Sequence, residues 1–181
     1  MSEAILETER LRLRALREDD LDNLCAIFGD AETMRYYPKV YDREEVRDIL
    51  AGQLRRFECY GGGVSAMELK STGAFVGDCG LLYQEVEGVW ELEVAYHVRR
   101  DHWGHGFAPE AARGCFAYGF AHYTVNRMIS MIRPVNTPSR RVAEKNGLTL
   151  AREIFWRGFQ HCVYVMERDQ WMVKNGTGGE R

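Results

Sequence analysis

The residues with the clearest chemical signal form a glycine-containing loop between an apolar strand and a helix. The strand is expected over residues 89–98, and the loop with Gly104 and Gly106 opens into a helix of about residues 104–122. Unpaired backbone N–H groups in the first turn of a helix point toward one spot, and glycines let the backbone approach a ligand. The sequence therefore predicts an anion site at this loop, suited to a pyrophosphate.

Two common kinds of pyrophosphate loop do not fit these residues. A P-loop requires a Lys followed by Ser or Thr after its last glycine, and no Lys lies near this loop. A dinucleotide-binding fingerprint requires a third glycine, at a position where this chain has Pro109. On the loop alone, an ordinary connection between a strand and a helix stays open as the alternative.

Four segments resemble one family in their order along the chain. They are residues 7–14 (ETERLRLR), 73–80 (GAFVGDCG), 103–111 (WGHGFAPEA) and 134–142 (PVNTPSRRV), the last with Gly147 eleven residues past Asn136. Together they resemble the GNAT superfamily of N-acetyltransferases, and within it the group that acetylates ribosomal-protein N-termini. The resemblance covers about residues 6–170, which is nearly the whole chain.

The resemblance implies a fold and a co-substrate. The fold is α/β (α+β), with a mixed, mostly antiparallel central sheet, helices on both faces and a splayed strand pair that holds acetyl-CoA. The enzyme would move an acetyl group from acetyl-CoA to an amine by direct transfer within a ternary complex. The residues expected to bind the co-substrate are Tyr96, His97, Val98, Trp103, Gly104, His105, Gly106, Phe107, Ala108, Asn136 and Arg140.

Glu93 is the expected general base. The alternation of residues 90–96 places Glu91 and Glu93 on the same face of the strand. Burial of a carboxylate in a central strand raises its pKa toward the range that a base needs. Glu91, nearer the start of the strand, is the weaker candidate and is expected to bind the acceptor. Alternatively, Glu93 only orients the acceptor or pairs with an arginine such as Arg127 or Arg133.

Ser139 is the proton donor that the resemblance suggests for the leaving thiolate. Many members of the superfamily carry a Tyr seven residues after the Asn, where this chain has Ala143. In the ribosomal-type group, a Ser three residues after the Asn is the suggested donor. The alternative for Ser139 is a helix cap, because Ser is common at that position. Tyr36 and Tyr37, which follow the first helices, are expected to line the acceptor groove.

The acceptor and the class of function both stay open. A protein N-terminal α-amine is the first expected acceptor, followed by a small amine such as a polyamine, an amino acid or an antibiotic. Two residues depart from the pattern of many members: Ala143 replaces the Tyr, and Asp101 stands in place of Gln or Arg. A non-catalytic acyl-CoA-binding module therefore stays open as an alternative interpretation. A dinucleotide oxidoreductase is a distant third interpretation.

Size, charge and cysteine usage fit one cytoplasmic domain. We expect an N-acetyltransferase domain over residues 1–175 and a disordered tail over 176–181, as a monomer or homodimer. The net charge of −3 argues against general nucleic-acid binding. No membrane partner is expected, because the chain has no long apolar run. Five scattered cysteines indicate reduced thiols, and the histidines lack the spacing of a metal site.

Alternating strands and helices must position these residues. The patterning predicts strands near residues 5–14, 64–70, 75–84, 89–98, 128–132, 149–157 and 161–168. It predicts helices over 18–28, from a capping signal at Asp42 and Glu45 to the glycines at 61–63, over 104–122 and over 138–146. This order is typical of a mixed sheet with helices on both faces.

Overall fold

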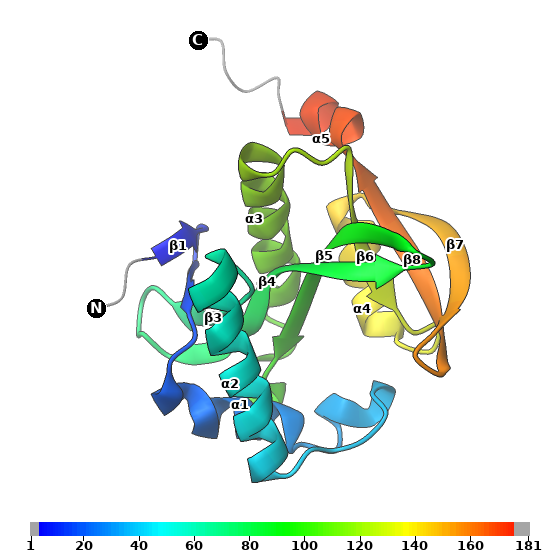
Figure 1. Ribbon diagram of the computed structural model, residues 1–181. Helices are drawn as coiled ribbons and strands as arrows, with labels where there is room; N and C mark the ends of the chain where they lie inside the picture. The colour runs from blue at the N-terminus through cyan, green and yellow to red at the C-terminus, as the bar shows by residue number, and fades with distance from the viewer. Residues whose placement is uncertain (1–3, 176–181) are drawn as a thin grey trace.

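The computed structural model describes residues 4–175, an α/β (α+β) fold around one eight-stranded, mostly antiparallel sheet (Figure 1). The strands are β1 (Ala4–Glu7), β2 (Leu11–Ala15), β3 (Val64–Leu69), β4 (Phe75–Val86), β5 (Val89–Val98), β6 (Arg127–Ile132), β7 (Thr149–Trp156) and β8 (Phe159–Glu167). The α-helices are α1 (Leu21–Phe28), α2 (Arg43–Tyr60), α3 (Phe107–His122), α4 (Thr137–Asn146) and α5 (Arg168–Asn175). Short 3-10 turns are η1 (Glu18–Asp20), η2 (Thr33–Tyr36) and η3 (Arg100–His102). The strand order β1-β2-β3-β4-β5-β6-β8-β7 confirms the predicted class of fold.

Two hydrophobic clusters cover the two faces of the sheet. On one face, Phe116 of α3 packs with sheet residues that include Leu13 and Leu92. On the other face, Leu24 of α1 and Val46 of α2 pack with sheet residues that include Ala66 and Phe75. The helices therefore lie on both faces, as predicted (Figure 1).

The start of the chain differs from the prediction. Residues 5–14 form two strands and not one, with a turn in which the Thr8 N–H donates to the Leu11 carbonyl at 2.9 Å. A carboxylate from α3 holds this turn. The Thr8 hydroxyl donates to Glu110 Oε1 at 2.6 Å, and the Arg10 N–H donates to the same oxygen at 2.8 Å. A contact across about a hundred residues thus holds the turn between the two strands.

The helix ends follow the local signals closely. At the start of α2, the Asp42 side chain accepts hydrogen bonds from the Glu44 and Glu45 N–H groups at 2.9 Å. The Glu45 carboxylate in turn accepts the Asp42 N–H at 3.1 Å, which confirms the predicted capping box. Gly61 ends the same helix in the left-handed conformation, with φ of 65°. Helix α5 was not predicted. It is short, and its single buried residue, Trp171, leaves no periodic apolar stripe.

The sheet opens between β5 and β6. Strand β5 pairs with β4 along its whole length, whereas β5 and β6 are parallel and pair only at Glu93 and Ile129. Just past this pair, the Ser130 hydroxyl donates to the Val94 carbonyl at 2.9 Å. Beyond it, none of the strands described here pairs with this edge of β5 over residues 95–98. The structure therefore confirms the predicted splayed strand pair.

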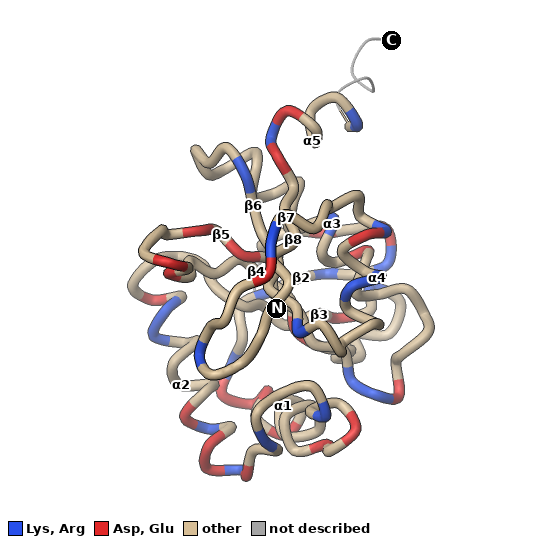
Figure 2. Tube along the Cα trace, turned by 90° about the vertical axis from the view of Figure 1, so that its right-hand side faces the viewer, with Lys and Arg blue, Asp and Glu red and all other residues tan. Residues whose placement is uncertain are grey.

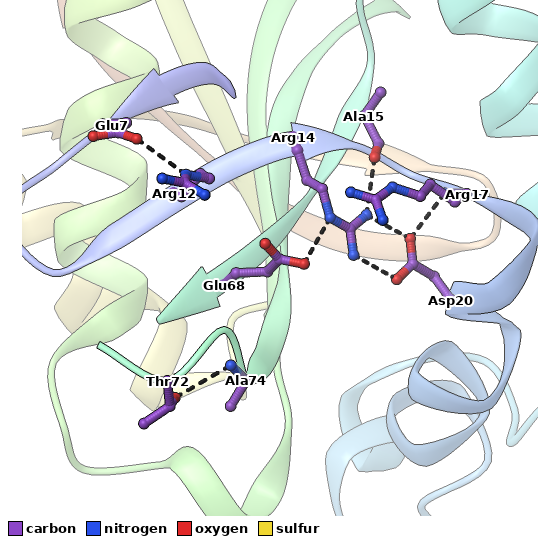
Figure 3. A network of polar contacts seen from close by, with 9 residues as sticks. All are labelled: Glu7, Arg12, Arg14, Ala15, Arg17, Asp20, Glu68, Thr72 and Ala74. Carbon is purple, nitrogen blue, oxygen red and sulfur yellow. Dashed lines mark hydrogen bonds and ion pairs between the residues drawn. The ribbon is translucent and has the colours of Figure 1, made fainter. Parts of the chain in front are cut away.

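A buried ion network ties β2 and β3 to the start of the first helix (Figure 3). The Arg14 guanidinium donates to both Asp20 oxygens at 2.7 and 2.8 Å, and its Nε donates to Glu68 at 2.7 Å. Asp20 also accepts the Arg17 N–H at 2.8 Å. Arg14 is 4% exposed and Asp20 is 2% exposed. Pairing and hydrogen bonding of this kind are what a buried charge requires.

Charges of both signs are interspersed along α2, as Figure 2 shows. Within residues 4–175, no helix is long and apolar enough to cross a membrane. The same part of the chain holds no group of three or more His, Cys, Asp or Glu side chains arranged to bind a metal ion. The tail predicted over residues 176–181 lies outside the described residues.

Candidate functional site

Two cavities meet at the opening between β5 and β6. The first, here called the loop cavity, has a volume of about 400 Å³ and extends to the glycine loop and the start of α3. The second, the inner cavity, has a volume of about 360 Å³ and extends to Glu93 and the ends of β6 and β8. The residues that line both cavities are Tyr36, Tyr37, Tyr96, His97, Asn136 and Ser139. Two ligands placed in these cavities would therefore touch the same wall.

The glycine loop leaves the start of α3 open to the loop cavity. Gly104 and Gly106 have φ of 80° and 79°, a conformation that other residues adopt only with strain. Gly106 is the N-cap, and no side chain caps the helix, so its first N–H groups stay available to a ligand. The Trp103 indole N–H donates to the Val98 carbonyl at 2.7 Å and holds the loop against the end of β5. This geometry is that of an anion site.

Arg10, from the turn between β1 and β2, braces the loop from outside. Its Nη1 donates to the His105 carbonyl at 3.0 Å, and its Nε donates to Glu110 at 2.7 Å. The guanidinium also lies 4.8 Å from the centre of the Phe107 ring. The sequence placed Arg10 only within a family-like strand. No local signal could show that it reaches a loop 95 residues away.

Glu93 is buried at the edge of the inner cavity. It is 7% exposed, and its Oε1 accepts the Met131 N–H at 3.0 Å, where the splayed strand offers no backbone acceptor. Burial raises its pKa from 4.5 to about 7, and the hydrogen bonds from Met131 and Gln84 oppose that rise. No arginine of the described residues forms an ion pair with Glu93, so the alternative of a simple arginine pair is wrong.

Glu91 occupies a different environment. Its carboxylate forms an ion pair with the Arg127 guanidinium, which includes a hydrogen bond from Nε at 3.1 Å. Glu91 is 5% exposed and lines neither cavity. The structure therefore does not bring the predicted acceptor ligand Glu91 to the site.

Ser139 lies in the first turn of α4, and its hydroxyl contacts a tyrosine. The cap of this helix is Asn136, whose side-chain oxygen accepts the Ser139 N–H at 3.2 Å, so the interpretation of Ser139 as the cap is wrong. The Ser139 and Tyr96 hydroxyl oxygens are 2.8 Å apart. Burial raises the pKa of Tyr96, so the phenol keeps its proton at neutral pH. Tyr96 was expected to bind the co-substrate, and no local pattern indicates that its hydroxyl also contacts Ser139.

A second polar contact joins His97, which lines both cavities, to the buried Asp78. His97 Nδ1 is 2.8 Å from Asp78 Oδ1, which also accepts the His97 N–H at 3.0 Å. Burial lowers the pKa of His97, but the Asp78 charge and hydrogen bond outweigh it and raise the pKa overall. The Tyr37 ring lies 5.2 Å away, centre to centre. Sequence reasoning missed Asp78, because it faces His97 only through the register of β4 and β5.

The remaining predicted residues divide into two groups. Trp103, Gly104, Gly106, Phe107, Ala108 and Val98 line the loop cavity, as do Tyr36 and Tyr37. His105 and Arg140 line neither cavity: the His105 ring stacks on Phe107, and Arg140 donates to the Tyr164 hydroxyl at 3.0 Å. The charge of Asp101 is balanced by Arg99, whose Nη2 lies 2.9 Å from it.

The sequence of the chain matches a known domain and several bacterial proteins. The family model described as an acetyltransferase (GNAT) domain matches residues 10–149. YkkB of Bacillus subtilis strain 168 is 37% identical over 164 residues, which cover 90% of this chain and 94% of that protein. The N-acetyltransferase p20 of Bacillus licheniformis is 32% identical, with 86% of each chain covered.

Solved structures share the fold. An acetyltransferase from Agrobacterium tumefaciens strain C58 is 25% identical, with a TM-score of 0.79 over 92% of this chain and 96% of that one. RimL, the ribosomal L7/L12 α-N-protein acetyltransferase in complex with coenzyme A, is 17% identical, with a TM-score of 0.73 over 93% and 99% of the two chains. These likenesses agree with the fold described above. The chain belongs to the GNAT family of acetyltransferases.

Proposed function

We propose that this acetyltransferase moves the acetyl group of acetyl-CoA to a primary amine by direct transfer, and that a protein N-terminal α-amine is its acceptor. The observation that carries the proposal is the position of Glu93. A buried carboxylate with a pKa of about 7 lines the inner cavity, which shares a wall with the loop cavity. A general base works best when its pKa lies near the operating pH.

Each residue has a separate part in the proposed reaction. The open first turn of α3 binds the pyrophosphate, and the free edge of β5 pairs with the pantetheine arm. Glu93 removes a proton from the ammonium group of the acceptor, and the neutral amine attacks the thioester carbonyl. The attack forms the C–N bond, and the C–S bond breaks as the nitrogen loses its second proton to solvent. The leaving thiolate takes a proton from the Ser139 hydroxyl, Ser139 regains one from the Tyr96 hydroxyl 2.8 Å away, and Tyr96 regains one from solvent.

Acetyl-CoA-dependent thiol release by the purified protein tests the proposal. The acceptor panel holds short peptides that begin with Ser, Ala or Met, together with spermidine, free amino acids and an aminoglycoside, beside a control without acceptor. Release with the peptides above the control supports the protein-type acceptor. Protein that binds acetyl-CoA but never exceeds the control contradicts the enzyme and favours the acyl-CoA-binding module.

A small amine is the second candidate acceptor, and the size of the inner cavity favours it. About 360 Å³ lies in the range of small-molecule sites, which begins at about 300 Å³. Six of the residues around this space also face the loop cavity, so a bound co-substrate would close one side. The same panel separates the two acceptors, because a peptide-specific enzyme does not turn over spermidine or free amino acids.

We expect Arg10→Ala to raise the KM for acetyl-CoA about tenfold with little change in kcat. The substitution removes the bonds to Glu110 and to the His105 carbonyl, and bonds of charged groups contribute roughly 1.5–3 kcal/mol each. Steady-state kinetics with varied acetyl-CoA measure the effect. Arg12→Ala is the matched control, because Arg12 pairs with the exposed Glu7 away from the loop. A fall in kcat with unchanged KM would contradict the bracing role.

We expect Ser139→Ala and Tyr96→Phe each to lower kcat about ten- to a hundredfold, with the KM for acetyl-CoA nearly unchanged. The two hydroxyls form one path for a proton, so the double variant should be little slower than either single one. Steady-state kinetics of all four proteins complete this cycle. Additive losses would mean that the two hydroxyls act independently, and the relay would be abandoned.

A further inference from the structure

The inner cavity contains two arginines besides Glu93. Arg133, at the end of β6, and Arg157, at the turn between β7 and β8, both line it. Within residues 4–175, neither guanidinium lies within ion-pair distance of a carboxylate. Arg157 lowers the pKa of Glu93 through its charge without forming an ion pair with it. The cavity therefore holds positive charge that the surrounding protein leaves unmatched.

Arg133 is held in a fixed position. Its Nη1 donates to the Tyr36 carbonyl at 3.1 Å, and its guanidinium lies 4.3 Å from the centre of the Phe159 ring. Its Nε is buried without a hydrogen-bond partner. Leaving a charged buried donor unsatisfied costs free energy, so such a group is expected to have a further partner.

The other groups around the cavity do not cancel this charge. Arg157 stacks over Trp156, with 4.2 Å to the ring centre, and is exposed on its other side. Burial lowers the pKa of His161, and the charge of Arg133 lowers it further, so this imidazole is neutral at physiological pH. Gln84 is neutral, and Glu93 provides the only carboxylate among the cavity residues. An acceptor that carries positive charge alone would meet two guanidiniums near its target carboxylate.

We propose that the inner cavity selects a primary amine that carries a carboxylate in the same small molecule or the same end of a peptide. The amine lies at Glu93, and the carboxylate lies at Arg133 and Arg157. A guanidinium offers paired N–H donors in a plane that matches a carboxylate. The inference rests on the proposed acetyl transfer and narrows its acceptor. Two sources share this chemistry: the carboxylate of a free amino acid and the acidic side chain of an N-terminal peptide residue.

Matched acceptor pairs test the selection. One arm compares free amino acids with their carboxamides, and a second compares C-terminally amidated peptides that begin Ser-Asp or Ser-Asn. Spermidine serves as the polycation. In one of the two arms, we expect kcat/KM to be at least tenfold higher for the acceptor with the carboxylate than for its neutral counterpart. The arm that shows this difference identifies where the carboxylate comes from. The α-amine of an amino acid is more basic than that of its carboxamide. At a given pH a smaller fraction of the amino acid therefore carries the neutral, reactive amine, so a preference for it cannot come from amine basicity. Equal rates within both pairs, or a preference for spermidine, would overturn the inference while leaving acetyl transfer in place.

Arginine variants test whether Arg133 causes the preference for anionic acceptors. We expect Arg133→Gln to lower kcat/KM for the anionic acceptor about ten- to a hundredfold and to leave its neutral partner within about threefold. Arg133→Lys should keep part of the preference, and it replaces the Gln variant if that variant does not fold. Arg152→Gln is the control, because Arg152 pairs with Glu87 outside the cavity. An equal fall for both members of a pair assigns Arg133 a structural role and overturns the inference. The absence of acetylation of any amine would remove the proposed function and the inference together.

Discussion

Glu93→Gln is expected to lower kcat/KM for the amine acceptor by about a hundredfold or more, the usual contribution of a general base. Glutamine cannot take the ammonium proton, but its amide oxygen can still accept the Met131 N–H. In the unchanged protein, activity should rise with pH through about 7, as the Glu93 carboxyl loses its proton. In the variant, this limb of the profile should disappear. Rates measured from pH 5.5 to 9 test both points.

The stability of the same variant separates a catalytic from a structural role. Because folding raises the pKa of Glu93 from 4.5 to about 7, the folded state binds its proton more tightly than the unfolded state. Glu93 therefore destabilises the fold increasingly as the pH rises from 4.5 to 7, and fully above 7. We expect Glu93→Gln to unfold at an equal or higher temperature at pH 8. Glu85→Gln, on the exposed part of β4, is the matched control. A destabilised variant with an unchanged pH profile would contradict the assignment of Glu93 as the base.

Asp20→Ala is expected to lower the free energy of unfolding by about 3 kcal/mol, because breaking a buried ion pair strands the remaining charge. The variant removes both oxygens that bind the Arg14 guanidinium and leaves it with Glu68 and a carbonyl (Figure 3). It also removes the acceptor of the Arg17 N–H at the start of η1. Urea unfolding followed by circular dichroism measures the loss.

Two comparisons make this result specific. Asp20→Asn keeps one acceptor oxygen, so its free energy of unfolding should lie between those of Asp20→Ala and the unchanged protein. Glu7→Ala removes the partner of Arg12 at the surface, and the unfolding midpoint should hardly move, because exposed pairs contribute little. A similar midpoint shift in the Asp20 and Glu7 variants would mean that burial does not set the importance of the Arg14 network.

The sequence predicted best the features that depend on neighbouring residues. The capping box at Asp42 and the glycine that ends α2 are local signals, and both are confirmed. The alternation around Glu93 predicted its burial, since a strand turns successive side chains to opposite faces. The burial of Glu91 was equally predictable, but its separation from the cavity depends on an arginine 36 residues away.

The features that escaped prediction join distant parts of the chain. Arg10 reaches Glu110 across 100 residues, and the Tyr96 hydroxyl reaches Ser139 across 43. Each contact depends on strand register and on how helices pack over the sheet, and neither is encoded by a local pattern. The same reason hides the charge of the inner cavity, because Arg133 and Arg157 meet there from different strand ends.

The single backbone pair between β5 and β6 gives the sheet a seam across its middle. In the proposed complex, the pantetheine arm lies along the open edge of β5 and acts as a partial strand. Its binding free energy then adds to that of folding, by about 2.7 kcal/mol when acetyl-CoA exceeds its Kd a hundredfold. The co-substrate is in this sense a structural component of the sheet that the enzyme exchanges at every turnover. The resistance of the protein to unfolding and proteolysis should therefore increase with the concentration of acetyl-CoA.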